Sequence, residues 1–437
     1  MPVLERVKQF VQECNSTNSS LDKIEVIRRF PDLQQLFKYV YDEINFQYGV
    51  TSKNIIKLRN LPRDGVQKNI DIFQLLIRLN DRLVTGHDAI KEVWQFMIDN
   101  PGFEGEILDI IDRNLKTRTD AKLINKIYPK CIETFPIELA DDYSPKVRKK
   151  IDWDKQVWLA SRKMDGIRLC VKFFTDIPVL TIGRSGKEFF TLDKIKEMLR
   201  AINLPNNIVF DGEVCKIGPN GEDDFQGILS EIRKKNHTIE NPRFKIFNLI
   251  PLHEFDEGEG PSIYLDRFAT LNSLIWKDNP ILSILEQTRV KSDEHLEELK
   301  AIAAQNNWEG LILRRGDRAY EATRTTDNLI KVKAFKDAEY VVLSTEMGPI
   351  RFIDKTTGLE KEEVMLTNVM IEHKGNPVSI GSGFKLEQRQ QFFKNPELII
   401  GKVITVKYFN ESMDSKTGKL SLRFPTCKAI HGDRRET

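Results

Sequence analysis

The sequence feature that most constrains the fold is the stretch Val157–Phe174, which reads VWLASRKMDGIRLCVKFF. Two apolar, β-prone runs flank an Asp-Gly pair, and glycine accepts the positive φ of a tight primed turn. The pattern predicts a β-hairpin with Lys163 at the end of one strand, Asp165 in the turn and Arg168 on the next strand. A hairpin with solvated charges is common in proteins of many kinds. Whether these charges are functional must therefore be judged from other features of the sequence.

Length and composition indicate how many domains the chain can form and of what kind. The 437 residues suffice for about three domains of ~150 residues. A hydrophobic content of 40% with 30% charged residues suits globular domains with real cores. The formal net charge is only +2, so a nucleic-acid partner would require basic residues concentrated on one face.

Cysteine usage and apolar runs indicate the compartment. The five cysteines are odd in number and form no C-x-x-C pair, which argues against a zinc ribbon or a disulfide framework. Reduced thiols in a cytoplasmic protein, in the host-cell cytoplasm if the chain is viral, are the simplest interpretation. The chain starts without a secretory apolar core, and no run approaches the ~18 consecutive apolar residues of a membrane span. We therefore expect no membrane partner.

The hydrophobic pattern divides the chain into three regions. In residues 1–130 apolar side chains recur at helical spacing, which predicts an all-helical domain. Residues 131–336 begin with a basic, proline-containing linker and continue with β-prone and helical runs, which predicts mainly antiparallel sheets covered by helices. In residues 337–437 short strands separated by glycines predict a small closed barrel, with the OB type as the leading interpretation. The expected fold class is multidomain α+β.

Basic turns between the N-terminal helices are candidates for contacts with phosphates. They lie in residues 53–63 and 113–126, and in the second turn Thr117 and Thr119 alternate with cations. Backbone amides, hydroxyls and cations together suit phosphate groups, whereas a solvated helix face is the plain alternative. The candidate DNA-binding residues are Arg59, Arg113, Lys116, Arg118 and Lys122.

Charged residues end or interrupt several otherwise apolar runs of the middle region. Arg184, Glu213 and Glu309 lie at such points, and Lys331 and Lys333 alternate so that both side chains point to one face of a strand. Two carboxylates can hold a hard cation, and several cations can hold phosphates. No G-x-x-x-x-G-K-[ST] motif is present, which excludes a P-loop. The combination predicts a pocket for a nucleotide and Mg²⁺.

In such a pocket Lys163 has a chemical role. An amine is a nucleophile only when it is neutral, and nearby cations with partial desolvation favour the neutral form. A neutral lysine facing the α-phosphorus of a nucleotide can displace pyrophosphate and form a phosphoramidate. Mg²⁺ would neutralise charge on the phosphates during this transfer.

These residues resemble a known family. The signature Lys-x-Asp-Gly-x-Arg is complete at Lys163–Arg168, and the blocks IGRSGKEF, VFDGEV, FKIFNL, EGLILR and LIKVK follow in the same order. The sequence thus resembles the ATP-dependent DNA ligases of the covalent nucleotidyltransferase superfamily. The resemblance implies ATP and Mg²⁺ as cofactors. It also implies three steps: adenylation of the enzyme, transfer of AMP to a 5′-phosphate, and attack by a 3′-hydroxyl with release of AMP.

The resemblance assigns roles to individual positions. Lys163 matches the lysine that becomes adenylated, and Arg168 and Arg184 match arginines that handle the ribose and the 5′-phosphate of the nick. Glu213 matches a glutamate at the ribose and metal region, and Phe247 matches the aromatic residue that stacks on adenine.

The remaining positions of the pocket follow in the same way. Glu309 matches a metal-binding carboxylate, and Lys331 and Lys333 match the pair at the α-phosphate. In the last region, LRFPTCKAIHGDR resembles the motif that orients the pyrophosphate leaving group. Arg423, Asp433 and Arg434 fall where that motif requires them.

Four positions depart from the family pattern. Ser161 replaces a frequent glutamate that reads the adenine amine, and Asn248 replaces the usual aspartate after the stacking aromatic residue. His431 stands where arginine is usual and Arg434 where lysine is usual. These departures leave the basis of adenine selectivity and the role of the last motif open.

The helical N-terminal region favours the compact, bacteriophage-like ligases, because FEGEILDIIDRNLKTRTDAKLINKIYP resembles their DNA-binding domain. The resemblance implies a monomer acting on nicked double-stranded DNA in replication, repair and recombination, with a sliding clamp or replication proteins as candidate partners. Contacts with the duplex should be sequence-independent and sensitive to salt. The alternatives are an RNA ligase or capping-type nucleotidyltransferase and, in another class, a non-catalytic nucleic-acid-binding protein.

Overall fold

The computed structural model describes residues 2–62, 65–218, 223–234, 236–274, 279–306, 308–333, 335–354, 360–413 and 418–431. The chain forms two compact units, one of residues 1–134 with 348–364 and one of residues 135–347 with 365–437. None of the helices in the described ranges is both long and apolar enough to cross a membrane.

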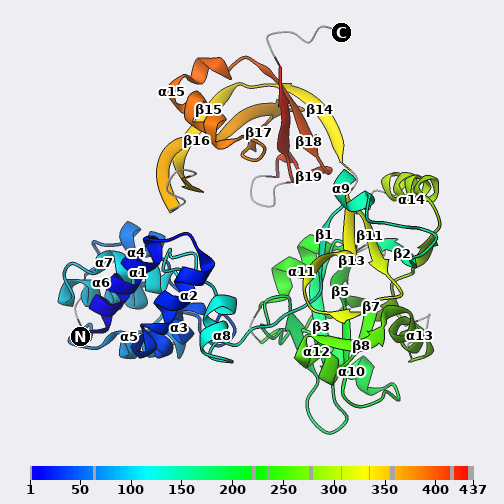
Figure 1. Cartoon of the computed structure of the whole chain (residues 1–437), viewed down its shortest axis with the longest axis horizontal. Helices are drawn as coiled ribbons and strands as arrows, with labels where there is room; N and C mark the ends of the chain where they lie inside the picture. Colours follow the sequence, from blue (N-terminus) through cyan, green and yellow to red (C-terminus); the bar gives the residue numbers. More distant parts are fainter. Residues whose placement is uncertain are drawn as a thin grey trace. The chain divides into compact units, whose positions relative to one another are not determined.

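Helices build the N-terminal region, as the apolar spacing predicts (Figure 1). In α3, for example, Leu36, Phe37 and Val40 are buried along one face. One hydrophobic core joins the helices, with Phe10 and Phe30 packed edge to face at its centre. The helices are α1 (Val3–Asn15), α2 (Ser20–Arg28), η1 (Pro31–Leu33), α3 (Gln34–Tyr41), α4 (Ser52–Lys57), α5 (Ile72–Asn80), α6 (Gly86–Asp99), α7 (Glu104–Ile111) and α8 (Ala121–Ile127).

Two large sheets form most of the middle region, and the first has the strand order β1-β13-β11-β2-β10. Its strands are β1 (Leu139–Asp142), β2 (Trp158–Arg162), β10 (Thr288–Val290), β11 (Gly310–Arg315) and β13 (Arg324–Lys333). One face packs against α9 (Pro145–Arg148) and α14 (Asp293–Gln305), where Trp158, Leu313 and Ile330 belong to one buried cluster. Because side chains alternate along a strand, Ser161, Ile312 and Lys331 lie on the opposite face.

The second sheet has the order β4-β3-β5-β7-β9, with β6 paired to β5. Its strands are β3 (Ile167–Phe173), β4 (Leu180–Gly183), β5 (Ile208–Ile217), β6 (Asp223–Asp224), β7 (Pro242–Pro251) and β9 (Leu282–Ile284). Phe210 and Phe244 belong to a cluster that also contains apolar residues of the helices α10 (Asp193–Arg200), α11 (Phe225–Glu231) and α13 (Tyr264–Leu274). Beside it lie α12 (Leu252–Glu257) and the pair β8 (Glu259–Ile263) and β12 (Ala319–Glu321).

The predicted hairpin around Asp165 is wrong. β2 pairs with β10 and β11 in the first sheet, whereas β3 pairs with β4 and β5 in the second. Residues 163–166 therefore pass from one sheet to the other and form the crossover between them. Gly166 in this crossover does not have a positive φ. Other strands occupy both edges of each strand, namely β10 and β11 beside β2 and β4 and β5 beside β3, so the two strands cannot pair with each other.

Among its described residues, the last region consists of strands around one hydrophobic core with a single α-helix, as expected for a small barrel. Its sheets have the orders β14-β18-β21, β15-β16-β17 and β19-β20. The elements are β14 (Lys336–Val341), β15 (Ser344–Ile353), β16 (Glu360–His373), β17 (Asn376–Ile380), α15 (Leu386–Lys394), η2 (Pro396–Leu398), β18 (Val403–Tyr408), β19 (Glu411–Met413), β20 (Leu420–Leu422) and β21 (Thr426–Ile430). Leu366, Val406 and Leu422 lie in the core of this region.

Candidate active site

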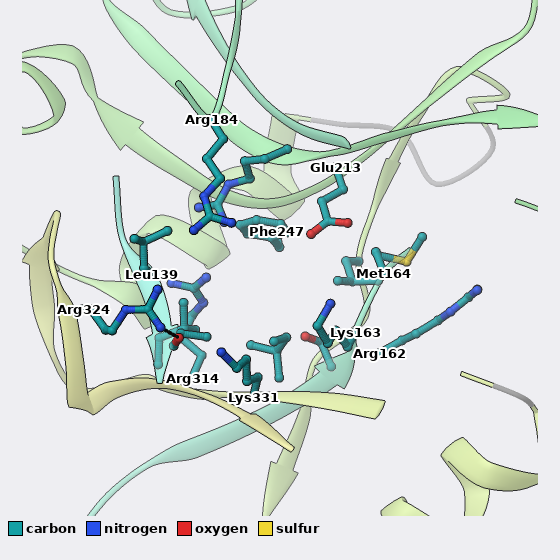
Figure 2. A pocket seen from close by; sticks show the side chains of 16 residues that line it. Leu139, Arg162, Lys163, Met164, Arg184, Glu213, Phe247, Arg314, Arg324 and Lys331 are labelled. Carbon is teal, nitrogen blue, oxygen red and sulfur yellow. Dashed lines mark hydrogen bonds between the residues drawn. The ribbon is translucent and has the colours of Figure 1, made fainter. Parts of the chain in front are cut away.

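A pocket lies between the two sheets of the middle region, each covered by helices on its outer face. Side chains from both sheets line it, and Figure 2 shows Lys163 and Glu213 on one side with Arg314 and Arg324 on the other. The lining residues are Leu139, Ala140, Ser161, Arg162, Lys163, Met164, Arg168, Arg184, Glu213, Phe247, Leu285, Ile312, Arg314, Arg324, Leu329 and Lys331. The structure thus brings together most residues that the sequence assigns to the nucleotide.

Lys163 follows β2 directly, where the chain leaves the first sheet. Its backbone N–H donates to the carbonyl of Gly310 at 2.9 Å, which fixes the start of the crossover against β11. Its Nζ donates to Oε2 of Glu309 at 2.5 Å, and Nζ of Lys333 lies 3.4 Å from the other carboxylate oxygen. Two lysines therefore share one largely buried carboxylate.

Gly166 allows the crossover to approach β5 closely. Its backbone N–H donates to Oε2 of Glu213 at 3.1 Å, and a Cβ at this position would lie 3.0 Å from the carbonyl oxygen of Val214. Burial raises the pKa of Glu213 to about 7, although Lys163 and Arg168 act in the opposite direction. Glycine is thus required at position 166 because the chain approaches β5 closely there, and not because of a tight turn with a positive φ.

Arg168 lies deep in the pocket and is paired with a carboxylate that the sequence did not single out. Its Nη2 donates to Asp211 at 2.7 Å, and its guanidinium lies 4.8 Å from the ring centroid of Phe247. Burial lowers the pKa of Arg168, but the charge of Asp211 and its hydrogen bond, together with the nearby Cys170 and Glu213, outweigh burial and raise the pKa. The guanidinium is therefore held charged beside the aromatic ring.

Phe247 forms an apolar wall of the pocket with Met164 and Leu285. The hydroxyl of Tyr264 donates to the backbone carbonyl of Phe247 at 2.7 Å, which anchors the aromatic residue from behind. A flat aromatic wall beside cationic groups suits a nucleotide base, because every base has a π-face.

A buried ion pair at the far end of the pocket was missed by sequence reasoning. Arg314 donates to the carboxylate of Glu138, and both side chains are 5% exposed. The Arg314 guanidinium also lies 4.8 Å from the ring centroid of Tyr264. The sequence did contain a signal for Arg314: it lies two residues after Ile312 on β11, so the two side chains share a face of the strand.

The remaining cations of the predicted pocket lie at its rim. Arg184 follows β4 and is exposed, and Lys331 on β13 has its Nζ 3.3 Å from Oδ2 of Asp142. Lys331 and Lys333 lie on the same face of β13, as their spacing predicts, and Lys333 reaches Glu309.

Arg423 lies between β20 and β21 and contacts the crossover. Its Nη2 donates to Oδ1 of Asp165 at 2.7 Å, and its Nη1 donates to the other carboxylate oxygen. Such a bidentate ion pair fixes the orientation of the Arg423 guanidinium as well as its distance from Asp165. Asp433 and Arg434, the other predicted residues of the last motif, lie outside the described residues.

The departures from the family pattern fall in different places. Ser161 lines the pocket, whereas Asn248 is fully buried outside it and accepts a hydrogen bond from Nε of Arg267 at 3.1 Å. His431 contacts the hydroxyl of Thr405 at 2.7 Å. Of the two departures at the base, only Ser161 is therefore placed to touch a nucleotide.

The predicted DNA-binding side chains differ in their surroundings. Arg113 is half-buried and donates to the carbonyl of Phe46 at 2.9 Å, so its guanidinium supports the fold of the turn. Nζ of Lys116 lies 2.6 Å from Asp109, and the side chain is 45% exposed. The other candidate side chains are exposed, namely Arg59, Arg118 and Lys122.

The threonine hydroxyls expected to face phosphates in the turn 113–126 do not do so. Thr117 and Thr119 are buried, bond to each other at 2.7 Å, and contact the hydroxyl of Tyr41. Buried and exposed residues alternate here, so Lys116 and Arg118 point outward while the threonines point inward. Any phosphate contact of this turn rests on its cations and backbone.

The donor set of the pocket fits a hard cation shared with phosphates. Glu213 and Glu309 face the same space near Lys163, and the charge of Glu309 contributes to the raised pKa of Glu213. No group of three or more His, Cys, Asp or Glu side chains that could hold a metal occurs among the described residues. Mg²⁺ is commonly held by one or two carboxylates together with substrate phosphates, so two carboxylates are sufficient.

Two family models match this chain. The model "ATP dependent DNA ligase domain" matches residues 138–333, and the model "DNA ligase OB-like domain" matches residues 357–430. The first contains the pocket, and the second covers most of the barrel region.

The chain is also similar to individual proteins. A DNA ligase of Thermococcus fumicolans is 26% identical over 295 residues, which cover 62% of this chain and 51% of the relative. The SPbeta prophage-derived DNA ligase-like protein LigB of Bacillus subtilis (strain 168) is 24% identical over 47% of this chain and 71% of the relative. The match thus spans only about half the length of the Thermococcus relative. A solved structure named "Pmar-Lig_Pre." has a TM-score of 0.80 at 22% identity over 98% of this chain and 99% of that chain, so the folds are alike.

Proposed function

The chain belongs to the ATP-dependent DNA ligase family, and on this basis we propose that it seals nicks between a 3′-hydroxyl and a 5′-phosphate in duplex DNA. The observation that carries the proposal is the position of Lys163. Its amine lies at the edge of a pocket that offers an aromatic wall at Phe247 and the carboxylate of Glu213, and it contacts the carboxylate of Glu309. These are the groups that a transfer of AMP to a lysine requires.

In the proposed first step the Lys163 amine attacks the α-phosphorus of ATP. The new N–P bond forms as the bond to the bridging oxygen breaks, and the electron pair leaves with pyrophosphate. Glu309 accepts a hydrogen bond from Lys163 and is therefore placed to receive its proton. Lys333 shares the carboxylate of Glu309 with Lys163, and Lys331 lies on the same face of β13, so both would stabilise charge on the α-phosphate.

The other assigned residues bind and orient the nucleotide. Phe247 would stack on adenine, and Arg168 and Arg184 would contact the ribose and the 5′-phosphate of the nick. Arg423, Asp433 and Arg434 would orient the departing pyrophosphate. Glu213 and Glu309 would hold Mg²⁺ together with the phosphates, and the metal would neutralise their charge.

In the second and third steps AMP moves from Lys163 to the 5′-phosphate, and the 3′-hydroxyl then displaces AMP to form the phosphodiester bond. The cations Arg59, Lys116, Arg118 and Lys122 would hold the duplex through its backbone, whatever its sequence. We propose the domain boundaries 1–130, 131–336 and 337–437, a monomeric enzyme, and the cytoplasm as its location. A sliding clamp remains a candidate partner.

The experiment that tests this function compares four substrates with one preparation. The protein is incubated with Mg²⁺ and either labelled ATP or labelled NAD, and then with nicked duplex DNA or single-stranded RNA ends. We expect a labelled protein with ATP only, followed by sealing of the DNA nick. Joining of RNA ends alone would instead indicate an RNA ligase. Failure to label the protein with either nucleotide would indicate a non-catalytic nucleic-acid-binding protein.

A further inference from the structure

A basic cluster lies beside the pocket, built from three cations around one carboxylate. Arg162, Arg243 and Lys245 surround Asp223, whose side chain is only 6% exposed. Nη1 of Arg162 lies 3.1 Å from Oδ2 of Asp223, Nζ of Lys245 lies 3.6 Å from the same oxygen, and Nη1 of Arg243 lies 3.8 Å from Oδ1. The Sγ of Cys215 also donates to Oδ1 of Asp223 at 3.1 Å.

The cluster continues the face of the second sheet that lines the pocket. Lys245 is the cross-strand partner of Glu213, and Arg243 is the partner of Cys215 two residues further along β5. Directly opposed residues share a face of the sheet with Cβ atoms about 5 Å apart. Lys245 therefore neighbours Glu213 on the face away from α10, and Arg243 lies one step further out.

Two of the three cations nevertheless lie outside the nucleotide pocket. Among the described residues that line the pocket, Arg162 is present but Arg243 and Lys245 are not. Figure 2 shows the Arg162 side chain extending out of the pocket, away from Lys331 and Phe247. A group bound by all three cations would thus reach the protein from outside the pocket, close to Lys163.

The charges of the cluster are suited to an anion. One carboxylate faces three cations, and the cations keep 20–29% of their side chains exposed whereas Asp223 is buried. Nε of Arg162 is buried and has no hydrogen-bond partner among the described residues. Three cations around one fixed carboxylate hold their ends close together in space, and this arrangement suits the oxygens of a phosphate group.

We propose that Arg162, Arg243 and Lys245 bind a backbone phosphate of the nicked DNA, and that Asp223 positions the three side chains. The inference rests on the proposed function, because it assigns a partner to the surface beside the adenylated lysine. The alternative source of the phosphate is the β,γ end of ATP. The position of Arg243 and Lys245 outside the pocket favours DNA.

The test uses the full chain with Lys245→Gln and Arg243→Gln, separately and together. Enzyme already labelled with AMP is mixed with nicked DNA over a range of salt concentrations, and binding and single-turnover sealing are measured. Each variant should bind DNA about tenfold more weakly, since a hydrogen bond between charged groups is lost. The slope of log affinity against log salt should fall by about one for each cation removed. Labelling by ATP without DNA should be unchanged.

The matched control is Lys196→Gln. Lys196 lies on α10, on the opposite face of the same sheet. Its side chain is 20% exposed, as is that of Lys245, and its Nζ lies 3.5 Å from Oε1 of Glu188, whereas Nζ of Lys245 lies 3.6 Å from Oδ2 of Asp223. It should leave both the affinity and the salt slope unchanged. Lys245→Arg keeps the charge and should restore binding, which separates a contact with phosphate from a structural role.

Two results would overturn the proposal. One is an unchanged affinity and salt slope in the double variant. The other is a raised KM for ATP in the labelling step with DNA binding intact, which would assign the cluster to the triphosphate. If the unmodified chain forms no adenylate or seals no nick, the proposed function fails, and this is visible before any variant is made.

Discussion

Glu213 lies buried between Lys163, Arg168 and the N–H of Gly166, and its pKa is raised from the ordinary 4.5 to about 7. Between these pH values the folded chain holds a proton that the unfolded chain has released, so stability falls as pH rises toward 7. Glu213→Gln removes this penalty. We therefore expect the difference in melting temperature between the variant and the parent to be more favourable to the variant at pH 8 than at pH 5. An equal difference at both pH values would contradict the raised pKa.

The ion pair Glu138–Arg314 tests the buried end of the pocket. Glu138→Gln leaves the Arg314 guanidinium buried without a full counter-charge, which should cost about 3–5 kcal/mol. The control is Glu25→Gln, because Glu25 pairs with Arg28 at 2.6 Å but both side chains are more than half exposed. This control should cost less than about 1 kcal/mol. Denaturant unfolding compares the two, and similar costs would show that burial does not matter here.

The crossover between the two sheets is the element on which the active site depends. Gly166→Ala would place a Cβ 3.0 Å from the carbonyl oxygen of Val214 and 3.2 Å from Oε2 of Glu213. The crossover must then move away from β5, and we expect labelling by ATP to fall at least about tenfold, since a small misplacement of reacting groups is costly. The measurement is the rate of labelling with intact secondary structure.

Gly105→Ala is the matched control for this substitution. Gly105 lies within α7, and nothing approaches within 4 Å of the position of its Cβ. Alanine favours a helix by roughly 0.5–1 kcal/mol over glycine, so this variant should be neutral or slightly more stable. Equal loss of labelling in both variants would argue against a special role for the crossover.

Elements with a strong internal period could be predicted from the sequence. The helical spacing predicted for residues 1–130 is seen in helices such as α3, and the alternation of Lys331 and Lys333 correctly places both on one face of β13. Strand pairing could not be predicted in the same way, because it depends on residues far along the chain. The stretch around Asp165 has a local hairpin pattern, yet distant strands occupy its edges.

The same distinction applies to the candidate site. Arg168 was predicted as a site residue, but its pairing with Asp211 and the pair Glu138–Arg314 were not, because these partners meet only when distant segments come together. Thr117 and Thr119 were expected to face phosphates, since the sequence does not show that their hydroxyls are buried beneath Tyr41.

At the scale of the whole molecule, Arg423 links the barrel region to the crossover through Asp165. If it orients pyrophosphate, Arg423→Ala should slow labelling by ATP by about 10²-fold, the size of effect typical for a lost charge-stabilising donor. Sealing of nicked DNA by enzyme already carrying AMP should continue near the parental rate. Parallel assays of the two steps check this, and an equal loss in both would assign Arg423 to DNA binding or to folding.

The most direct test of the central claim is to locate the adenylate. The chain is incubated with ATP and Mg²⁺, digested, and its peptides are measured by mass spectrometry, with Lys163→Ala treated in parallel. We predict one added AMP on the peptide that contains Lys163, and none in the variant. An adduct on another lysine, or one that persists in Lys163→Ala, would contradict the account.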